Sequence, residues 1–411
     1  MDALNQNFSS HKLSELRVAG VYLFGPEHAR ESDFINKLTT AAIKNAFREK
    51  ARRFHPDLRP HESPDLVEKN RRRFIKVKES YDLLQDFVTA QNPVPEPARF
   101  SPEPAPAPRQ KKIIAVGGAK GGIGKSTFTA NLGVFLATRG HRTVMVDLDL
   151  GGANLHLYLG QTFIHNSIND YFTRTVPHLA ELMIPTNYGP QLIGGDSSEL
   201  GSANITFWAK MKLIKSLRDL DADYVIIDLG SNTSFNILDF FLAADTNFVI
   251  STCEPASYLE AYNFIKVGLL RRLNRLFGGE SASAGKKNHA LQELIREATM
   301  SPDGAKAKTI SEMLARVEKH HPDYLPALKK AIDTYQPGLL INQVRDVSEV
   351  GPIVTRIKEV SRKMLGIKVR YVGAIPYLEE VKRSTKDLMP EVARNSQGVL
   401  AQRMAALTRE L

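Results

Sequence analysis

One stretch decides the fold of most of this chain: Lys112-Ile-Ile-Ala-Val-Gly-Gly-Ala-Lys-Gly-Gly-Ile-Gly-Lys-Ser-Thr127. Its apolar beginning predicts a short buried strand over residues 112–116, and the segment that follows the glycines predicts a helix over residues 126–139. The glycines between them allow backbone N–H groups to turn inward without a side-chain clash. The stretch therefore predicts a strand, a glycine loop and a helix in direct succession.

A phosphate-binding loop requires this order of elements. The amino end of the helix carries a partial positive charge, which favours an anion. Lys125 can neutralise the β- and γ-phosphates of a nucleotide, and the hydroxyl of Ser126 can bind Mg²⁺. We expect a nucleotide to contact the loop and the helix start, that is Gly121, Gly122, Ile123, Gly124, Lys125, Ser126 and Thr127.

Outward from this loop, apolar runs alternate with helical segments. Such runs predict further strands at residues 143–146, 224–227, 246–252, 338–341 and 370–375. Continuous apolar strands that alternate with helices indicate a parallel sheet covered on both faces. The sequence therefore predicts an α/β fold with a mostly parallel, doubly wound sheet.

Acidic residues stand at the ends of two predicted strands. Asp147 and Asp149 follow the strand at 143–146, and Asp228 follows the strand at 224–227. The carboxyl ends of strands in a doubly wound sheet face the ligand crevice. Carboxylates there can hold Mg²⁺ through water and orient an attacking water molecule. The expected metal-binding set is Ser126, Asp149 and Asp228.

Residues 274–336 fit this plan poorly, because they contain no strong strand signal. Helices are expected around residues 289–299, 308–320 and 324–335. The segment is either an inserted helical subdomain or a set of extra helices that cover the same domain, and the sequence leaves both interpretations open.

A proline-rich segment at residues 90–110 separates the part with the glycine loop, 111–411, from a helical module at 1–89. Alternating Pro and Ala favour an extended conformation, so we expect a semi-rigid tether. Two helices are expected in the module, one at 34–54 and one from residue 63 or 64 to 87. The tripeptide His55-Pro56-Asp57 ends the first helix, since the residue before proline leaves the helical region.

Composition limits the classes of protein to which the chain can belong. A single cysteine, Cys253, excludes a disulfide within the chain and the paired cysteines of a metal cluster. No secretory signal and no run of 18 apolar residues is found, so we expect a cytoplasmic protein. The net charge of +10 permits contact with nucleic acid or an anionic membrane without demonstrating either.

The loop has a second lysine, Lys120, and here the sequence resembles the deviant Walker A motif of the MinD/ParA family, of the SIMIBI type of P-loop proteins. The resemblance implies an ATPase that uses ATP and Mg²⁺ and that forms an ATP-dependent homodimer. Lys120 would reach the nucleotide of the partner subunit, Lys125 and Asp149 would act in catalysis, and Asp149 would activate water. The resemblance also implies contacts to the nucleotide from Asp147, Asn154, Asn342 and Pro376. One departure is Ala119, where the family has glycine, and it is tolerable if φ is negative.

Within the family, the segments at 149–160, 238–245 and 254–262 look most like FlhG, a regulator of flagellar number and placement. This implies a switch that controls the position or number of a cellular structure and whose state a protein partner reads. A ParA-type DNA partition ATPase is the alternative, with DNA binding less favoured. An amide-forming synthetase on the same fold is less favoured still.

The N-terminal module resembles a J-domain in the segments 46–57 and 74–84, which contain the His-Pro-Asp tripeptide and a Phe…Tyr-x-x-Leu helix. This resemblance implies docking of a DnaK-type chaperone through His55, Pro56 and Asp57. A J-like fold that only docks another partner is the alternative.

At the C-terminus, Leu400, Met404, Leu407 and Leu411 form a stripe. A helix packed on the domain is favoured over one that contacts a membrane.

Overall fold

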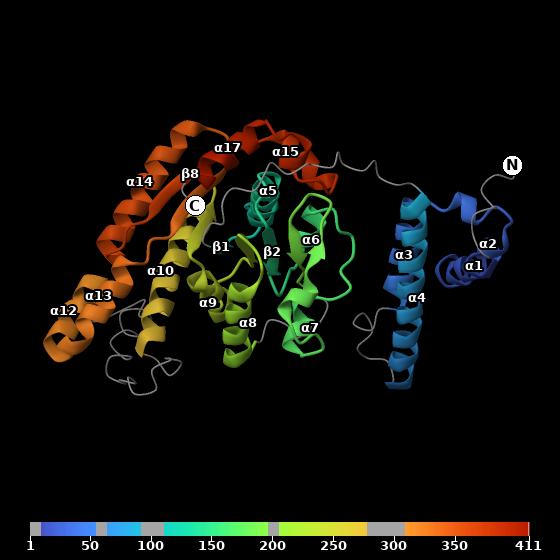
Figure 1. Cartoon of the computed structure of the whole chain (residues 1–411), viewed down its shortest axis with the longest axis horizontal. Helices are drawn as coiled ribbons and strands as arrows, with labels where there is room; N and C mark the ends of the chain where they lie inside the picture. The colour runs from blue at the N-terminus through green and yellow to red at the C-terminus, as the bar shows by residue number, and fades with distance from the viewer. Residues whose placement is uncertain (1–9, 55–63, 92–110, 196–204, 278–308, 410) are drawn as a thin grey trace. The chain divides into compact units, whose positions relative to one another are not determined.

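A computed structural model describes residues 10–54, 64–91, 111–195, 205–277, 309–409 and 411. Contacts between residues divide the chain into two compact units, Met1–Arg99 and Phe100–Leu411. In the described residues the first unit is helical and the second contains a β-sheet (Figure 1). The predicted tether lies outside the described residues from residue 92 to residue 110.

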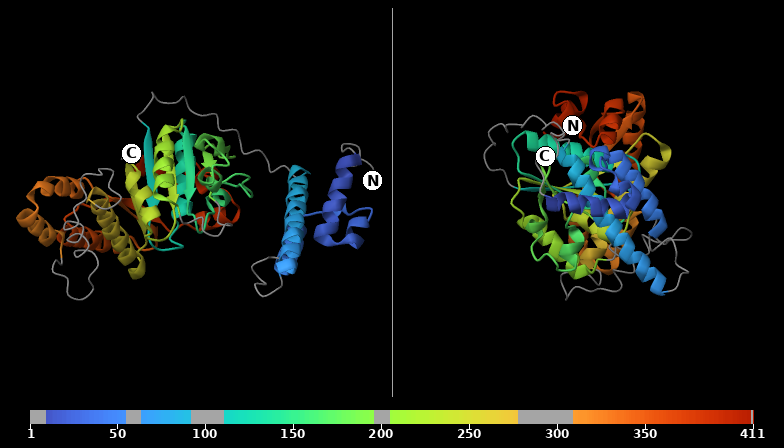
Figure 2. Two further views of the ribbon diagram at one scale, coloured as in Figure 1. Left: turned by 90° about the horizontal axis from the view of Figure 1, so that it is seen from below. Right: turned by 90° about the vertical axis from the view of Figure 1, so that its right-hand side faces the viewer.

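The N-terminal unit is a small helical assembly with one apolar core. Its described elements are α1 (Ser10–Phe24), α2 (Pro26–Arg30), the 3-10 turn η1 (Ile35–Lys37), α3 (Thr40–Phe54) and α4 (Pro64–Gln91). Helices α1 and α4 lie side by side, as Figure 2 shows. The core contains Leu16, Leu23, Ile43, Val77, Leu84 and Phe87. Aromatic stacking joins α3 to α4, because the ring of Phe47 lies 4.5 Å from that of Tyr81.

The predicted single helix over 34–54 is wrong at its beginning. Helix α3 starts at Thr40, and Leu38 before it has an extended backbone with ψ of 125°. The hydroxyl oxygen of Thr39 accepts a hydrogen bond from the N–H of Ala42 at 3.2 Å. A threonine in this position caps a helix start. The apolar side chains of Ile35 and Leu38 still reach the core, but from a 3-10 turn and an extended residue.

The described residues of the second unit form one eight-stranded sheet in the order β3-β4-β2-β5-β1-β6-β7-β8. All pairs are parallel except the short β3–β4 pair, so the predicted α/β class is confirmed. The strands are β1 (Lys112–Gly117), β2 (Thr143–Leu148), β3 (Ile184–Pro185), β4 (Gln191–Ile193), β5 (Tyr224–Leu229), β6 (Thr246–Ser251), β7 (Gly338–Val344) and β8 (Arg370–Pro376).

Strand β1 lies near the middle of the sheet, between β5 and β6. The chain passes from β1 to β2 on one side and later returns to β6 on the other side. Strand order therefore reverses at β1, and ligands of such sheets bind outside the carboxyl ends of the strands at this point. The glycine loop that follows β1 lies there.

Helices cover both faces of the sheet, because the strand side chains alternate between two apolar clusters. One face carries α5 (Lys125–Thr138), α6 (Leu155–Tyr158), α16 (Glu391–Arg394) and α17 (Val399–Thr408). The other carries α7 (Ile168–Phe172), α8 (Phe207–Asp219), α9 (Phe235–Ala243), α10 (Pro255–Phe277), α12 (Ile310–His320), α13 (Leu325–Asp333) and α14 (Val350–Val360). Figure 1 shows α5 and α17 on one side of β1 and β2 and α8 and α9 on the other.

The segment predicted as helical between the sixth and seventh strands is described in part. Residues 278–308 lie outside the described residues, and they include the helix expected at 289–299. Helices α12 and α13 are present near the predicted positions. Their buried side chains, among them Met313, Val317 and Leu328, belong to the same apolar cluster as the strand residues Leu339 and Ile341. Among the described residues, these helices therefore share the core of the sheet.

Two features of the C-terminal half bear on the site. Helix α15 (Glu379–Lys386) follows β8, and α17 buries Leu400, Met404 and Leu407 against α5 and β8. The predicted C-terminal stripe thus packs on the domain. Among the described residues, no helix combines the length and the hydropathy that crossing a membrane requires.

Candidate nucleotide-binding site

The glycine loop has backbone conformations that side chains rarely adopt. Gly118, Gly122 and Gly124 have φ values of 155°, 75° and 85°. A Cβ atom on Gly124 would lie 2.5 Å from Nδ2 of Asn342, and one on Gly118 would lie 2.9 Å from a backbone oxygen. Ala119 is not among the residues with positive φ, so its methyl group is accommodated. All three positions therefore require glycine for the conformation. Gly118 also leaves room for the close approach of β6, and Gly124 leaves room for that of β7.

Lys125 is the first residue of α5 and is 7% exposed. Its ammonium group donates a hydrogen bond to the backbone oxygen of Lys120 at 2.9 Å. Burial lowers the pKa of Lys125, and the charges of Asp228 and Asp149 act in the opposite direction. A buried cation that donates to a neutral carbonyl in this way can exchange that contact for an anionic oxygen.

Two carboxylates lie side by side at the carboxyl ends of neighbouring strands. Asp147 on β2 is in register with Asp228 on β5, and both are buried. Burial raises the pKa of Asp147 to about 8, and the charge of Asp228 adds to this effect. Burial also raises the pKa of Asp228 to about 6, against hydrogen bonds from Ser126 and Thr129 that lower it. A bound cation would stabilise the ionised form of two such adjacent buried acids. The pair therefore marks a candidate metal site.

Asp147 also fixes the backbone of the loop that follows it. Its carboxylate accepts a hydrogen bond from the N–H of Asp149 at 3.1 Å and one from the N–H of Leu155 at 2.9 Å. Asn154 is the residue before α6 and is half-buried. The orientation of the segment 149–155 therefore depends on a buried carboxylate that also borders the candidate metal site.

Asp149 lies where two loops meet. A Cβ atom on Gly230, after β5, would be 2.6 Å from Oδ1 of Asp149, so the carboxylate of Asp149 lies directly against this glycine. The loops after β2 and β5 thus touch each other beside the glycine loop. The structure brings together Lys125, Asp147, Asp149 and Asp228, as the sequence predicts.

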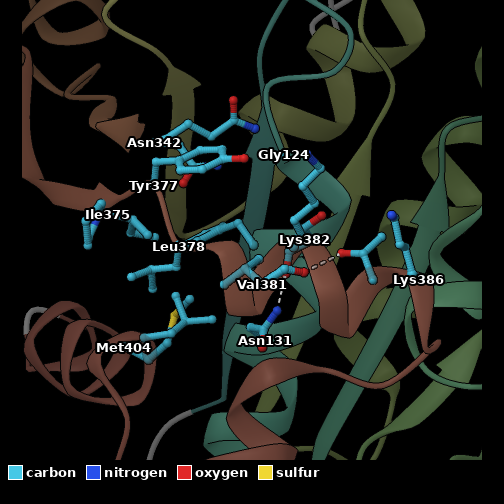
Figure 3. A pocket seen from close by; sticks show the side chains of 16 residues that line it. Gly124, Asn131, Asn342, Ile375, Tyr377, Leu378, Val381, Lys382, Lys386 and Met404 are labelled. Carbon is cyan, nitrogen blue, oxygen red and sulfur yellow. Dashed lines mark hydrogen bonds between the residues drawn. The ribbon is translucent and has the colours of Figure 1, made fainter. Parts of the chain in front are cut away.

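A cavity of about 390 Å³ opens next to the helix start (Figure 3). Gly124, Thr127, Asn342 and Pro376 line it, so residues predicted from three distant segments meet at one cavity. The amide nitrogen of Asn342 donates a hydrogen bond to the backbone oxygen of Ile123 at 2.8 Å. This bond leaves Oδ1 of Asn342 as the acceptor that a ligand can use.

Sequence reasoning missed the far wall of this cavity. It consists of side chains from α15 and α17 and from the turn between β8 and α15, namely Tyr377, Leu378, Val381, Lys382, Leu400 and Met404. The only available signal was the apolar stripe that contains Leu400 and Met404. That stripe predicted that the C-terminal helix packs on the domain. It did not indicate that two of its side chains would line a ligand cavity.

Sequence reasoning also missed a partner of Lys120. The ammonium group of Lys120 lies 2.6 Å from Oε2 of Glu254, which stands between β6 and α10. The pKa of the Glu254 carboxyl is lowered by this hydrogen bond. No sequence pattern links two residues that are 134 positions apart.

The predicted docking tripeptide, His55, Pro56 and Asp57, lies outside the described residues. The helix end before it is described. The guanidinium groups of Arg53 and Arg73 lie 5.5 Å and 5.8 Å from the ring centre of Phe54. The ring of Phe54, in the last turn of α3, therefore lies between one cation from α3 and one from α4.

Comparison with known proteins agrees with this geometry. A model of the CobQ/CobB/MinD/ParA nucleotide binding domain matches residues 114–391. The chain is 29% identical over 167 residues to the flagellum site-determining protein YlxH of Helicobacter pylori, which is 38% of this chain and 53% of that protein. It is 27% identical over 158 residues to the antiactivator FleN of Pseudomonas aeruginosa, 38% of this chain and 56% of that protein. The matches thus span little more than half the length of these relatives.

Among solved structures, the chain is similar to the septum site-determining protein MinD complexed with Mg-ADP from Pyrococcus horikoshii. The sequence identity is 18% and the TM-score 0.46, and the match covers 73% of this chain and 96% of that one. MinD in the MinC:MinD complex of Aquifex aeolicus has 18% identity, a TM-score of 0.47 and coverage of 73% and 95%. Because the family match extends over more than half of the sequence, the chain belongs to the CobQ/CobB/MinD/ParA nucleotide-binding family.

Proposed function

We propose that this chain is a Mg-ATP-dependent switch ATPase of the MinD/ParA/FlhG type. It binds ATP, assembles as a homodimer and hydrolyses ATP to control the placement or number of a cellular structure. The observation that carries the proposal is the buried pair Asp147 and Asp228 beside the buried ammonium group of Lys125. This arrangement provides one cation for phosphate, one carboxylate, that of Asp228, for a metal, and a second, that of Asp147, which holds the neighbouring loop.

The residues present fit Mg²⁺ and a nucleotide. Hard cations such as Mg²⁺ prefer oxygen ligands and keep several waters, and carboxylates and hydroxyls supply such ligands here. Asp228 already accepts a hydrogen bond from the Ser126 hydroxyl, so both groups converge on one point. Ser126, Asp228 and Asp149 would hold the ion. When bound, it would neutralise charge on the phosphate oxygens.

The chain's own groups divide the remaining work. Lys125 exchanges its contact with the Lys120 carbonyl for the β- and γ-phosphates. Asp149 orients the attacking water, because it lies between the loops after β2 and β5 and is less buried than Asp147. Asp147 holds the backbone of Asp149 and Leu155 in place and so positions Asp149.

The cavity favours adenine as the base. Oδ1 of Asn342 is held as an acceptor by the bond from Nδ2 to Ile123. The amino group at ring position 6 of adenine can donate to this oxygen, whereas guanine has a carbonyl at the same position, which cannot donate. Pro376 and the side chains of Leu378 and Val381 supply apolar surface for the ring.

The N-terminal unit serves as a docking module in this proposal, for a DnaK-type chaperone or another protein partner, and the cytoplasm is the location. Support comes from the aromatic packing of Phe47 on Tyr81 and from the cations beside Phe54. These contacts hold the end of α3, which leads directly into His55, Pro56 and Asp57.

The test combines nucleotide binding, hydrolysis and assembly on the full chain. The wild type should bind ATP more tightly than GTP, hydrolyse it only with Mg²⁺, and shift toward a dimer with ATP in analytical ultracentrifugation. Lys120→Ala should bind ATP and remain monomeric. Lys215→Ala, an exposed lysine on α8, is the matched control. Equal dimer formation by Lys120→Ala and wild type would contradict the role of Lys120 between subunits.

A further inference from the structure

Lys120 is held by its side chain within the protomer. Its ammonium group lies 2.6 Å from Oε2 of Glu254, and the two side chains are 32% and 70% exposed. In the proposed function this ammonium group must move away from Glu254 to reach the nucleotide bound to a second copy of the chain. Its present partner therefore competes with assembly.

Hydrogen bonds hold the turn that presents Glu254. The buried Ser257 hydroxyl accepts a hydrogen bond from the N–H of Thr252 at 2.9 Å, and the N–H of Ser257 donates to the Glu254 backbone oxygen at 2.9 Å. These bonds fix the chain between β6 and α10. Glu254 is thus a carboxylate on an ordered helix start, aimed at the glycine loop.

Lys120 is held at two points, its backbone oxygen and its side chain. The backbone oxygen of Lys120 accepts a hydrogen bond from Lys125, and its side chain pairs with Glu254. A phosphate group in the loop competes for Lys125 and frees the backbone of Lys120. The phosphate cannot replace Lys120 as the partner of the Glu254 carboxylate, because carboxylate and phosphate are both anions. The ion pair with Glu254 therefore remains as a separate barrier.

We propose that Glu254 is a positioning residue that retains Lys120 in its own protomer and so raises the ATP-bound protein concentration needed for assembly. This inference rests on the proposed ATP-dependent dimer. An exposed ion pair changes an equilibrium by about 1.4- to 5-fold. Two such pairs break in each dimer, so their loss should tighten the dimer dissociation constant by about 2- to 25-fold.

The first experiment measures the ATP-dependent dimer of Glu254→Gln by sedimentation over a range of protein concentrations. We expect a tighter dimer than in the wild type, and a smaller difference at high salt because salt screens exposed ion pairs. Glu260→Gln, an exposed carboxylate on α10, should behave like the wild type. Glu254→Asp, which keeps the charge, should restore wild-type assembly at least in part. A weaker dimer in Glu254→Gln overturns the proposal, since it places Glu254 in contact with the second copy.

The second experiment does not depend on assembly. The rate at which an amine-reactive acylating reagent modifies Lys120, measured by mass spectrometry in the nucleotide-free full chain, should rise in Glu254→Gln and stay unchanged in Glu260→Gln. An unchanged rate in Glu254→Gln overturns the contact itself. If the rate rises but the wild type forms no dimer with ATP, the contact stands, whereas the proposed function and the role of Glu254 in assembly both fail.

Discussion

In the sheet-containing unit the predicted chemical groups stand at the ends of buried strands, whereas in the N-terminal unit the predicted tripeptide follows the end of a helix. Asp147 and Asp228 are fixed by strand register and by hydrogen bonds from buried residues. The end of α3 is fixed by a few aromatic contacts around Phe47 and Phe54.

The difference shows what positions a functional residue in each unit. A side chain on a central strand is positioned by neighbours from many parts of the sequence, so its surroundings are set by the whole sheet. Among the described residues, the end of α3 is positioned by contacts within the N-terminal unit alone. We therefore expect substitutions in the two units to act independently, and the following experiments can break or sharpen that comparison.

The largest effect should come from Lys125→Ala. The buried ammonium group is the cation that meets the phosphates, and hydrogen bonds to charged groups are strong, so ATP binding should weaken by about 100-fold or more. Isothermal titration measures this, with Lys215→Ala as the control. Helix content and melting of the N-terminal unit should stay unchanged. ATP binding close to that of the wild type would remove Lys125 from the phosphate site.

Asp149→Ala should stop hydrolysis while ATP binding persists. Loss of a group that orients or activates water reduces turnover by about 10²- to 10⁴-fold. The measurements are phosphate release and nucleotide binding on the same preparation, and the protein should accumulate in its ATP-bound state. Turnover at the wild-type rate would show that another group handles the water.

Leu84→Ala tests the independence of the N-terminal unit. Leu84 is fully buried in that core, and such truncations cost about 2–5 kcal/mol of unfolding free energy. Leu83→Ala, at a half-buried neighbour, should cost less. Denaturant unfolding followed by circular dichroism gives both values. ATP hydrolysis by Leu84→Ala should equal that of the wild type, and a parallel loss of hydrolysis would mean that the units stabilise each other.

The acid pair predicts how stability depends on pH. The pKa values of Asp147 and Asp228 are raised from 3.8 to about 8 and about 6. Between about pH 4 and about pH 8 the folded protein therefore binds more protons than the unfolded chain. The free energy of unfolding falls as pH rises through this range. For Asp228 alone the loss is on the order of 2–3 kcal/mol.

Thermal unfolding of the nucleotide-free protein at several pH values measures this slope. Mg-ADP should flatten it, because a bound cation stabilises the ionised carboxylates. Asp228→Asn should flatten it too, whereas Asp219→Asn, at an exposed position of α8, should not. A slope of the opposite sign in the wild type would show that the pair is ionised and stabilised without a ligand.

The smallest effect on the ATPase should come from His55→Gln. In the J-like interpretation this change removes stimulation of a DnaK-type chaperone by the full chain, because the tripeptide is the docking element. ATP hydrolysis by the sheet-containing unit should not change. Stimulation that persists in the variant, or that is absent in the wild type, would reduce the module to an adaptor for another partner.

The strongly apolar strands were predictable, and those predicted at 112–116, 143–146, 224–227, 246–252, 338–341 and 370–375 correspond to β1, β2, β5, β6, β7 and β8. Strands β3 and β4 were missed, because two or three residues at a sheet edge carry no periodic signal. Helix α1 was missed because its apolar residues do not all face the core. Val18 is 55% exposed while Leu16 is buried, and this obscures the helical stripe.

The sequence by itself determined the glycine loop, the order of the strongly apolar strands along the chain, and the acids at the strand ends. These features are local, since glycine conformation, apolar runs and helix dipoles act over a few residues. Only the tertiary structure decided that Asp147 lies in register with Asp228, that α15 and α17 wall the cavity beside Asn342, and that Lys120 pairs with Glu254. Those contacts join residues far apart in sequence, and only the packing of the whole sheet brings them together.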